Sequence, residues 1–380
     1  MNTPTRRDFL TTAGAASAAW LAPRVLPGAG APRPTRAGEL QSVAVSKDGR
    51  GFVLEASGRR FVPWGFNYDH DEQGRLLEDY WHAEWPKVEA DFEEMRDLGA
   101  NVVRIHLQVG KFMQGPDEPA APALERLARM LRLAERLGLY LDVTGLGCYH
   151  KQDVPAWYDR LDEPARWRAQ ARFWDAVAAA CAASPAVFCY DLMNEPVVPG
   201  GRRQAGDWLG PAFAGKHFVQ CITLDQAGRP RPEIAQRWVQ TLAAAIRRRD
   251  RRHLVTVGLV PWSLDRPGLT SGFVPDRIAP DLDFLSVHLY PEKSKLREAL
   301  ATLSGFAVGK PVLVEETFPL HCSIEELEQF IEQSAGAAAG WIGFYWGKTP
   351  EECRRSNTIA DAITLQWLEL FERRARTAPQ

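Results

Sequence analysis

Short apolar segments recur along the chain, and longer polar segments separate them. Eight of these segments are rich in Val, Ile, Leu and aromatic residues, at 61–67, 101–107, 139–144, 187–193, 253–258, 284–289, 311–316 and 341–346. Their nearly continuous apolar character is typical of parallel strands that are buried on both faces.

The segments between these predicted strands have the periodicity of amphipathic helices. In residues 124–133 leucines recur at spacings of three and four, while Arg and Glu occupy the other face. Ser323-Ile324-Glu325-Glu326 has the pattern of a capping box, and Gly99 and Gly138 stand where a helix would end before a strand. This repetition of strand, helix and glycine predicts one (β/α)8 barrel.

A β-hairpin is predicted before the barrel, and one long loop within it. Residues 51–62 alternate between apolar and polar side chains around Ala56-Ser57-Gly58, which predicts the short N-terminal hairpin. The segment between the fourth and fifth strands is the longest and is rich in Gly and Pro. Because loops after barrel strands build the active-site face, this segment should shape the substrate cleft. A linker to a second domain is the alternative, but helical periodicity resumes at Glu233.

The first residues have the order of a twin-arginine export signal. Thr5-Arg6-Arg7-Asp8-Phe9-Leu10 is followed by a small apolar run, and Ala29-Gly30-Ala31 offers a cleavage site. We therefore expect a signal peptide at 1–31, a linker or extension at 32–50 and the catalytic domain at 51–380. The expected location is the periplasm or the medium, with no membrane attachment after removal of the signal.

Composition and charge narrow the range of partners. The 46 basic and 48 acidic side chains are mixed along the chain and give a formal net charge of −2, which does not favour a nucleic-acid partner. The six cysteines lie far apart without metal-ligand spacing, and most should be small buried side chains. We expect a monomer that binds carbohydrate and needs no metal or other cofactor.

Two carboxylates are predicted to face each other at one end of the barrel. The strand at 187–193 ends in Asn194-Glu195-Pro196, and the strand at 311–316 ends in Glu315-Glu316. Both strand ends lie on the face where barrel enzymes carry their active sites. Two facing carboxylates suffice for glycoside hydrolysis, but the sequence does not give their separation, which decides between retention and inversion.

Several motifs in order along the chain resemble glycoside hydrolase family 5 of clan A, the cellulase and mannanase family. The resemblance runs from about Gly51 to the C-terminus. The motifs that carry it are Gly99-Ala100-Asn101-Val102-Val103-Arg104, Asn194-Glu195-Pro196, His288-Leu289-Tyr290, Glu316 and Trp346. It implies a retaining β-glycosidase that acts on a β-linked glucan, mannan or related oligosaccharide.

The resemblance also implies roles for individual residues. Glu195 would be the general acid/base and Glu316 the nucleophile. The supporting residues would be Asn194 at the sugar 2-hydroxyl, Arg104 and Tyr290 beside the nucleophile, His288 near the acid/base, Trp346 as the floor under the sugar, and Asn67 as a further substrate-binding or supporting residue. Trp81, Trp85, Trp157, Trp208 and Trp262 fall in or near predicted loops and are candidates for sugar subsites.

The sequence departs from the family in two places. Thr317-Phe318 replaces the Phe-Gly that usually follows the nucleophile, and the third strand lacks a histidine, for which His150 is a candidate substitute. The choice between Glu315 and Glu316 rests on the spacing from Pro311 and on the expectation that neighbouring strand residues point to opposite sides.

Two other functions are considered. A metal-dependent hydrolase could use His106, Asp191, His288 and Glu316 as ligands, but no close metal-binding spacing supports it. A catalytically silent carbohydrate-binding barrel is the other alternative, although a pure binder has no need for Arg104 and Tyr290 beside a nucleophile.

Overall fold

The computed structural model of the protein describes residues 40–264, 269–344 and 346–377. The predicted signal peptide at 1–31 lies outside these residues. In the part of the chain that is described, no helix is both long and apolar enough to cross a bilayer. All six cysteines lie in this part as free thiols, and five of them are buried, as expected.

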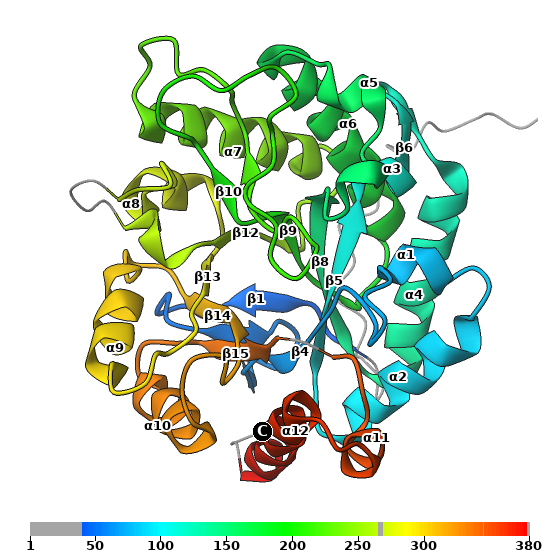
Figure 1. The fold of residues 1–380 in the computed structure, drawn as a ribbon, viewed down its shortest axis with the longest axis vertical. Helices are drawn as coiled ribbons and strands as arrows, with labels where there is room; N and C mark the ends of the chain where they lie inside the picture. Colours follow the sequence, from blue (N-terminus) through cyan, green and yellow to red (C-terminus); the bar gives the residue numbers. More distant parts are fainter. Residues whose placement is uncertain (1–39, 265–268, 345, 378–380) are drawn as a thin grey trace, which may run out of the picture. The chain divides into compact units, whose positions relative to one another are not determined.

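Eight parallel strands close into a barrel, which confirms the predicted fold (Figure 1). In chain order the strands are β4 (Trp64–Tyr68), β5 (Val102–Gln108), β8 (Tyr140–Gly147), β9 (Val187–Asn194), β12 (Leu254–Leu259), β13 (Leu285–His288), β14 (Val312–Thr317) and β15 (Gly340–Gly343). Each predicted apolar run contains or overlaps one of them. β15 pairs with β4, so that the last strand closes the barrel on the first.

Helices surround the barrel and connect successive strands (Figure 1). The longer ones are α2 (Trp85–Asp97), α4 (Ala121–Leu137), α6 (Glu163–Cys181), α7 (Arg231–Arg247), α9 (Leu296–Gly305), α10 (Ile324–Ser334) and α12 (Ile359–Thr377). Short helices are α1 (Leu77–Tyr80), α3 (Val109–Phe112), α5 (Ala156–Asp159), α8 (Pro275–Ile278) and α11 (Pro350–Arg355). The predicted capping box opens α10, and Gly138 ends α4 at a φ of 73°.

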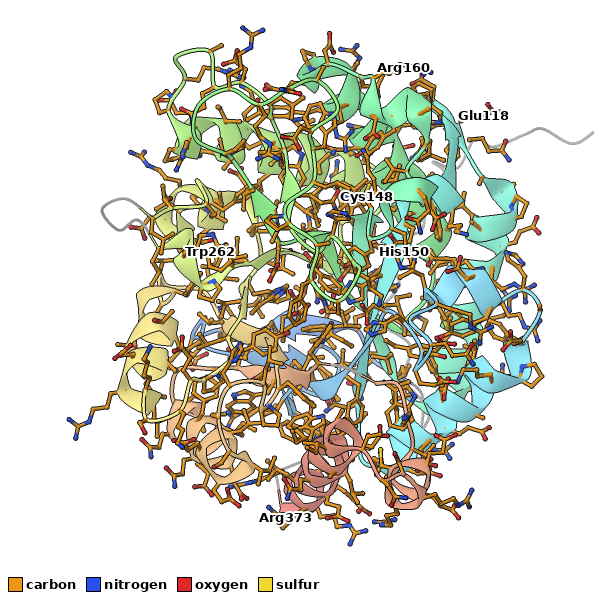
Figure 2. All side chains as sticks on the ribbon, viewed as in Figure 1. Glu118, Cys148, His150, Arg160, Trp262 and Arg373 are labelled. Carbon is orange, nitrogen blue, oxygen red and sulfur yellow. The ribbon has the colours of Figure 1, made fainter. Side chains whose placement is uncertain are left out.

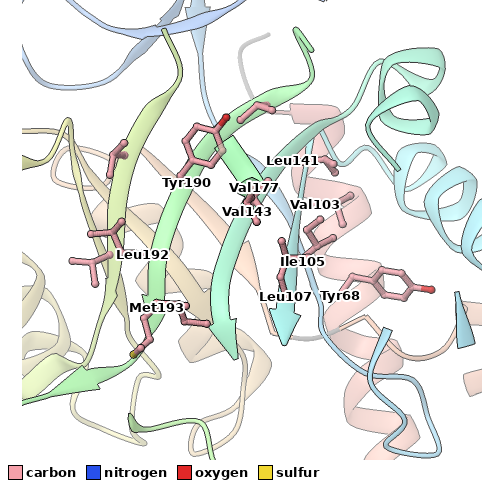
Figure 3. Packing of buried hydrophobic residues seen from close by; sticks show 14 of the residues in the cluster. Tyr68, Val103, Ile105, Leu107, Leu141, Val143, Val177, Tyr190, Leu192 and Met193 are labelled. Carbon is pink, nitrogen blue, oxygen red and sulfur yellow. The ribbon is translucent and has the colours of Figure 1, made fainter. Parts of the chain in front are cut away.

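Side chains on each barrel strand alternate between the helix layer and the barrel interior. On β5, Val103, Ile105 and Leu107 belong to the core under the helices (Figure 3). Arg104 and His106 lie between them in sequence, are also buried, and point the other way, toward polar groups of neighbouring strands. The outer face of the barrel is therefore apolar, while its interior becomes polar toward the C-terminal ends of the strands.

A small antiparallel sheet closes the other end of the barrel with aromatic side chains. It contains the predicted hairpin, β2 (Phe52–Leu54) and β3 (Arg60–Phe61), and a third strand, β1 (Val43–Val45). β1 falls in the segment 32–50, for which we expected no strand. The Phe52 ring packs edge-on against Phe188 and Phe284 at 5.2 and 5.0 Å. Apolar surface is therefore buried at this end of the barrel, whereas polar side chains fill the end formed by the C-termini of the strands.

The C-terminal helix α12 covers the junction between the first and last strands. Phe371 of α12 lies 4.0 Å from the Phe66 ring and 4.7 Å from the Trp64 ring, measured between centroids. Trp367 packs so closely against β15 that a Cβ atom at Gly343 would lie 2.0 Å from its ring. Gly343 is therefore required by the close approach of α12.

We predict that Gly343→Ala destabilises the fold by about 1–3 kcal/mol, because the added methyl group would force Trp367 or the strand to shift. Gly336→Ala is the matched control, since a Cβ atom there meets nothing within 4 Å and Gly336 does not have a positive φ. Urea unfolding should show the loss for Gly343→Ala and none for Gly336→Ala. Equal stabilities of the two variants would contradict this account of α12.

Candidate active site

Glu195 stands immediately after β9 in a backbone conformation that few residues adopt. Its φ is 46°, and its N–H donates to the Gly258 carbonyl of β12 at 2.9 Å. The long segment that follows, at 195–230, contains the short strands β10 (Pro196–Val197) and β11 (Gln220–Cys221) and returns to the barrel mouth. There the Gln220 N–H donates to the Glu195 carbonyl at 3.2 Å. Both contacts fix the turn that directs the Glu195 carboxylate into the mouth.

Glu316 lies on β14 between two strong hydrogen-bond donors. Arg104 Nη1 donates to its Oε1 at 2.6 Å, and the Tyr290 hydroxyl donates to its Oε2 at 2.6 Å. Burial, with a smaller contribution from Glu195, raises the pKa of Glu316 above its usual value, and His288, Arg104 and Tyr290 oppose this rise. Arg104 and Tyr290 therefore occupy the places beside Glu316 that the family resemblance implied.

Glu315 and Glu316 do not point to opposite sides of the strand, contrary to our expectation. Both carboxylates face Arg104, with Glu315 Oε2 at 3.4 Å from Nη2 and Glu316 Oε1 at 2.6 Å from Nη1. The pairing register shifts at the end of β13 and again near the end of β14, and such irregularities interrupt strict alternation. Glu315 is also fully buried, so that its carboxylate is not a solvated charge at the end of the strand.

Glu195 and Glu316 are close neighbours across the mouth. One carboxylate oxygen of each, together with a ring nitrogen of His288, lies within a group of atoms that are at most 4.8 Å apart. His288 Nδ1 lies 3.0 Å from Glu195 Oε1 and 3.5 Å from Glu316 Oε2. The separation between the Glu195 and Glu316 carboxylates, which could not be deduced from the sequence, is therefore short.

Arg104 is the centre of the polar network inside the barrel. Its side chain is fully buried, and its Nη2 donates to Asp191 Oδ2 at 2.7 Å and to Asn194 Oδ1 at 3.0 Å. Its Nη1 donates to Asn67 Oδ1 at 2.8 Å as well as to Glu316. Asn67 in turn donates to the carbonyls of Glu315 and Gly343, so that its amide is fully engaged within the protein. Asn67 thus supports the site and offers no free group to a substrate.

The protonation of His106 follows from its neighbours. Because Asn67 uses its amide N–H groups on two carbonyls, its Oδ1 must accept from His106 Nε2, 3.0 Å away. His106 Nδ1 therefore accepts from the Tyr149 hydroxyl at 2.5 Å. Burial and the nearby Arg104 hold the pKa of His106 well below its usual value, in agreement with a neutral ring.

His150 does not join this network. Its Nδ1 lies 3.4 Å from Asp153, on its own loop after β8 (Figure 2). The preceding residue, Tyr149, is the one that turns inward, where its carbonyl accepts from the His217 N–H and its hydroxyl reaches His106. Tyr149, which the sequence did not indicate, is therefore the residue of this loop that joins the network.

Trp346 lies away from the mouth, contrary to the expectation of a sugar floor. It is 1% exposed, and its ring packs edge-on against Phe66, which lies under α12. The half-buried Phe344 occupies the mouth instead, with its ring 6.4 Å from Tyr290 and 6.0 Å from Phe218. Because Gly343 faces α12, alternation along the strand would place its neighbour Phe344 inward.

Among the five loop tryptophans considered as subsites, the structure favours one. Trp81, Trp85 and Trp208 are at most 4% exposed and serve as packing residues. Trp157 is half-buried, whereas Trp262 is 37% exposed in the short turn after β12 (Figure 2). Since β12 lies between β9 and β13, Trp262 follows a strand beside those that carry Glu195 and His288.

The proposed metal ligands are only partly available. Both ring nitrogens of His106 are engaged, and Asp191 accepts from Gly258 N and Met193 N at one oxygen and from Arg104 and Thr144 at the other. Glu195, His288 and Glu316 remain close enough together to hold an ion. However, the Arg104 cation 2.6 Å from Glu316 already occupies the position of a counter-charge.

A barrel with two carboxylates this close at the C-terminal ends of its strands has the architecture of enzymes that cleave glycosides. Comparison with known families agrees with this class. The profile of the cellulase family, glycosyl hydrolase family 5, matches residues 55–348. The chain belongs to this family.

Two relatives from fungi are similar over part of their length. Mannan endo-1,4-beta-mannosidase A of Aspergillus aculeatus is 25% identical over 269 residues, and that of Emericella nidulans is 24% identical over 253 residues. The alignments cover 61% and 60% of this chain and 63% and 57% of the relatives, so that the chain spans less than two thirds of their length.

Solved structures share the fold at lower identity. An exo-beta-1,4-mannosidase from Opitutaceae bacterium strain TAV5 superposes with a TM-score of 0.64 at 19% identity, over 88% of this chain and 62% of that one. The beta-mannanase of the blue mussel Mytilus edulis superposes with a TM-score of 0.56 at 18% identity, over 87% of this chain and 96% of that one. These similarities support the barrel fold.

We predict that Phe344→Ala lowers kcat/KM for glycoside hydrolysis by about tenfold, because an aromatic face is lost at the mouth. Trp346→Phe should instead lower the free energy of unfolding by about 1–3 kcal/mol and change kcat/KM less than about threefold, since its ring packs in the core. Steady-state kinetics and urea unfolding of both variants separate the two roles. A loss of kcat/KM in Trp346→Phe without one in Phe344→Ala would instead assign the sugar-binding ring to Trp346.

Proposed function

We propose that this protein is a retaining β-glycosidase that acts on β-1,4-linked mannan or manno-oligosaccharides. The observation that carries the proposal is the short distance between Glu195 and Glu316, whose nearest oxygens lie within 4.8 Å. Retaining enzymes place their two carboxyl groups about 5–5.5 Å apart, whereas inverting enzymes need about 6.5–9.5 Å to admit a water molecule. The distance observed here is that of the retaining rather than the inverting arrangement.

In the first step, Glu316 attacks the anomeric carbon and forms a glycosyl ester. The bond from the anomeric carbon to the glycosidic oxygen breaks, and the Glu195 proton passes to that oxygen, so that the leaving sugar departs as an alcohol. Glu316 suits the attack because Arg104 and Tyr290 hold both of its oxygens and fix its orientation. Glu195 suits proton transfer because it is the more exposed of the two carboxylates, with 16% of its side chain accessible against 7% for Glu316.

In the second step, the same two residues release the sugar. Glu195, now ionised, takes a proton from water, whose oxygen attacks the anomeric carbon and displaces Glu316 as a carboxylate. Asn194 supports both steps in this proposal. Its Oδ1 accepts from Arg104 and one of its amide hydrogens is donated to the Phe218 carbonyl, which leaves the second hydrogen for the sugar 2-hydroxyl.

The substrate class rests on the named relatives. Both fungal relatives are mannan endo-1,4-beta-mannosidases, and the structural neighbours include beta-mannanases and an exo-beta-1,4-mannosidase. A β-linked glucan is the alternative substrate within the same family. We also propose export through the twin-arginine pathway, which the order of residues at 5–31 supports.

We predict that Glu316→Gln abolishes hydrolysis, because the amide cannot form the glycosyl ester. Glu195→Gln should lower kcat/KM on mannotriose by about 10²–10⁴-fold, with a smaller loss on an aryl β-mannoside whose phenol leaves without protonation. Proton NMR of the first product should show the β-anomer. Glu118→Gln, an exposed change on the peripheral strand β7 (Glu118–Pro119; Figure 2), should match the wild type.

An α-anomer as the first product would show inversion and would exclude Glu316 as a nucleophile. Wild-type rates for either variant would refute the assignment, and a wild-type protein that binds mannotriose without cleaving it would support the silent carbohydrate-binding barrel. A panel of gluco- and manno-oligosaccharides decides between the two substrates.

A metal-dependent hydrolase remains a second candidate because Glu195, His288 and Glu316 could hold an ion. We predict that dialysis against EDTA leaves kcat unchanged, since the Arg104 and His288 cations already neutralise these carboxylates. Activity that is lost with EDTA and restored by zinc or manganese would favour the metal enzyme.

A further inference from the structure

The mechanism proposed above uses Glu195 and Glu316 and leaves a third glutamate unexplained. Glu315 lies on β14 beneath Glu316 and is fully buried, so that it cannot touch a sugar in the mouth. A buried carboxylate is costly unless cations and donors surround it. The cations and hydrogen-bond donors around Glu315 should therefore indicate its role.

Both ring nitrogens of His288 face carboxylates. On the mouth side, Nδ1 lies 3.0 Å from Glu195 Oε1 and 3.5 Å from Glu316 Oε2. On the inner side, Nε2 lies 3.4 Å from Glu315 Oε2. A neutral imidazole has one N–H and could serve only one of these sides, whereas an imidazolium serves both.

We propose that Glu315 is a positioning residue that keeps His288 in its imidazolium form, with the Nδ1–H directed at Glu195 and Glu316. This inference rests on the proposed retaining mechanism for the role of the His288 charge. Burial alone would lower the pKa of His288, but Glu316, Glu195 and Glu315 outweigh it and raise the pKa to about 10.

The surroundings of Glu315 keep it ionised. Burial raises the pKa of Glu315, but Arg104 at 3.4 Å, His288 and a hydrogen bond with Asp142 lower it by more. Burial and the Glu315 carboxylate raise the pKa of Asp142 well above its usual value, which favours the neutral form of Asp142 beside Glu315. Of these two acids, the ionised form is favoured at Glu315, which faces His288.

The backbone leaves space for these groups to converge. A Cβ atom at Gly258 of β12 would lie 2.9 Å from His288 Nε2, 3.0 Å from Arg104 Nη2 and 3.1 Å from Glu315 Oε2. The titratable groups that surround them are Arg104 and His106 of β5, Asp142 of β8, Cys189 and Asp191 of β9, His288 of β13, Glu315 and Glu316 of β14, and Glu195 and Tyr290 in the loops above.

A fixed positive charge at His288 serves both steps of the reaction. Before the first step Glu316 is negative and Glu195 is protonated, and after it Glu316 is an ester and Glu195 is negative. His288 lies within 3.5 Å of both and can therefore stabilise the negative charge before and after it moves. The buried Glu315 has no part in the bond changes, so that its charge holds the His288 proton throughout.

The test is the titration of His288 measured by ¹⁵N NMR of histidine-labelled protein across about pH 5 to 11, a range that includes its pKa of about 10. In the wild type His288 should remain largely an imidazolium up to about pH 9 and titrate above it. In Glu315→Gln its titration midpoint should fall by about 1 pH unit or more, the effect of one neighbouring carboxylate. Asp142→Asn should leave His288 protonated, because it replaces one neutral group by another.

Asp250→Asn is the matched control. Asp250 faces His253 in a second buried pair, at the N-terminal end of β12 and away from the mouth. It should change stability without moving the His288 titration. If Glu315→Gln does not fold, Glu315→Asp carries the test, since it keeps the charge but withdraws it from Nε2 and should lower the midpoint by a smaller amount.

A second readout is the pH profile of kcat/KM on an aryl β-mannoside. In Glu315→Gln the rate at high pH should fall together with the His288 titration. An unchanged His288 midpoint in Glu315→Gln, or an equal fall in Asp142→Asn, would overturn the proposal. An inverting product with the expected NMR result would instead reject the mechanism and leave the assignment of Glu315 to His288 intact.

Discussion

The structure of the site depends on one buried guanidinium. Arg104 is completely enclosed, and three carboxylates, Asp191, Glu315 and Glu316, lie within 3.4 Å of its nitrogens. Removing one partner of such a buried pair costs about 3–5 kcal/mol, because the other charge is left without compensation. The planar fork of the guanidinium fixes direction as well as distance, so that strands β9 and β14 present their acids at set positions. Glu316 is oriented by the same group that makes its burial tolerable.

Much of this arrangement could be predicted from the sequence, because it depends on local patterns and on topology. Eight apolar runs separated by helical periodicity suffice for a closed barrel, and the barrel brings all strand ends to one face. Glu195 and Glu316 could then be placed on one face without knowledge of any distance, whereas the places of Arg104, His288 and Tyr290 beside them were implied by the resemblance to the family. Strand β1 of the small antiparallel sheet was not predicted, since it has only three residues and pairs with one strand.

The errors occur where tertiary contacts override local rules. Strict alternation placed Glu315 and Glu316 on opposite sides, whereas register shifts turn both toward Arg104. Trp346 matched a motif position, but the covering helix α12 encloses the neighbouring core, and Phe344 takes the place at the mouth. Tyr149 had no recognisable pattern at all, because its role depends on a hydrogen bond to His106 from another strand. Bulges and loop paths of this kind have no short-range signature.

The short distance between the Glu195 and Glu316 carboxylates follows from how their charge is compensated. Arg104 contacts Glu316, and His288 contacts both Glu316 and Glu195. An inverting site would have to open the pair by about 2 Å or more to admit water, and at least one carboxylate would then lose its cation. Buried acids that share cations are drawn together, and this closeness favours direct attack by Glu316. The stereochemistry proposed for the reaction is therefore a consequence of gathering four acidic side chains around two cations.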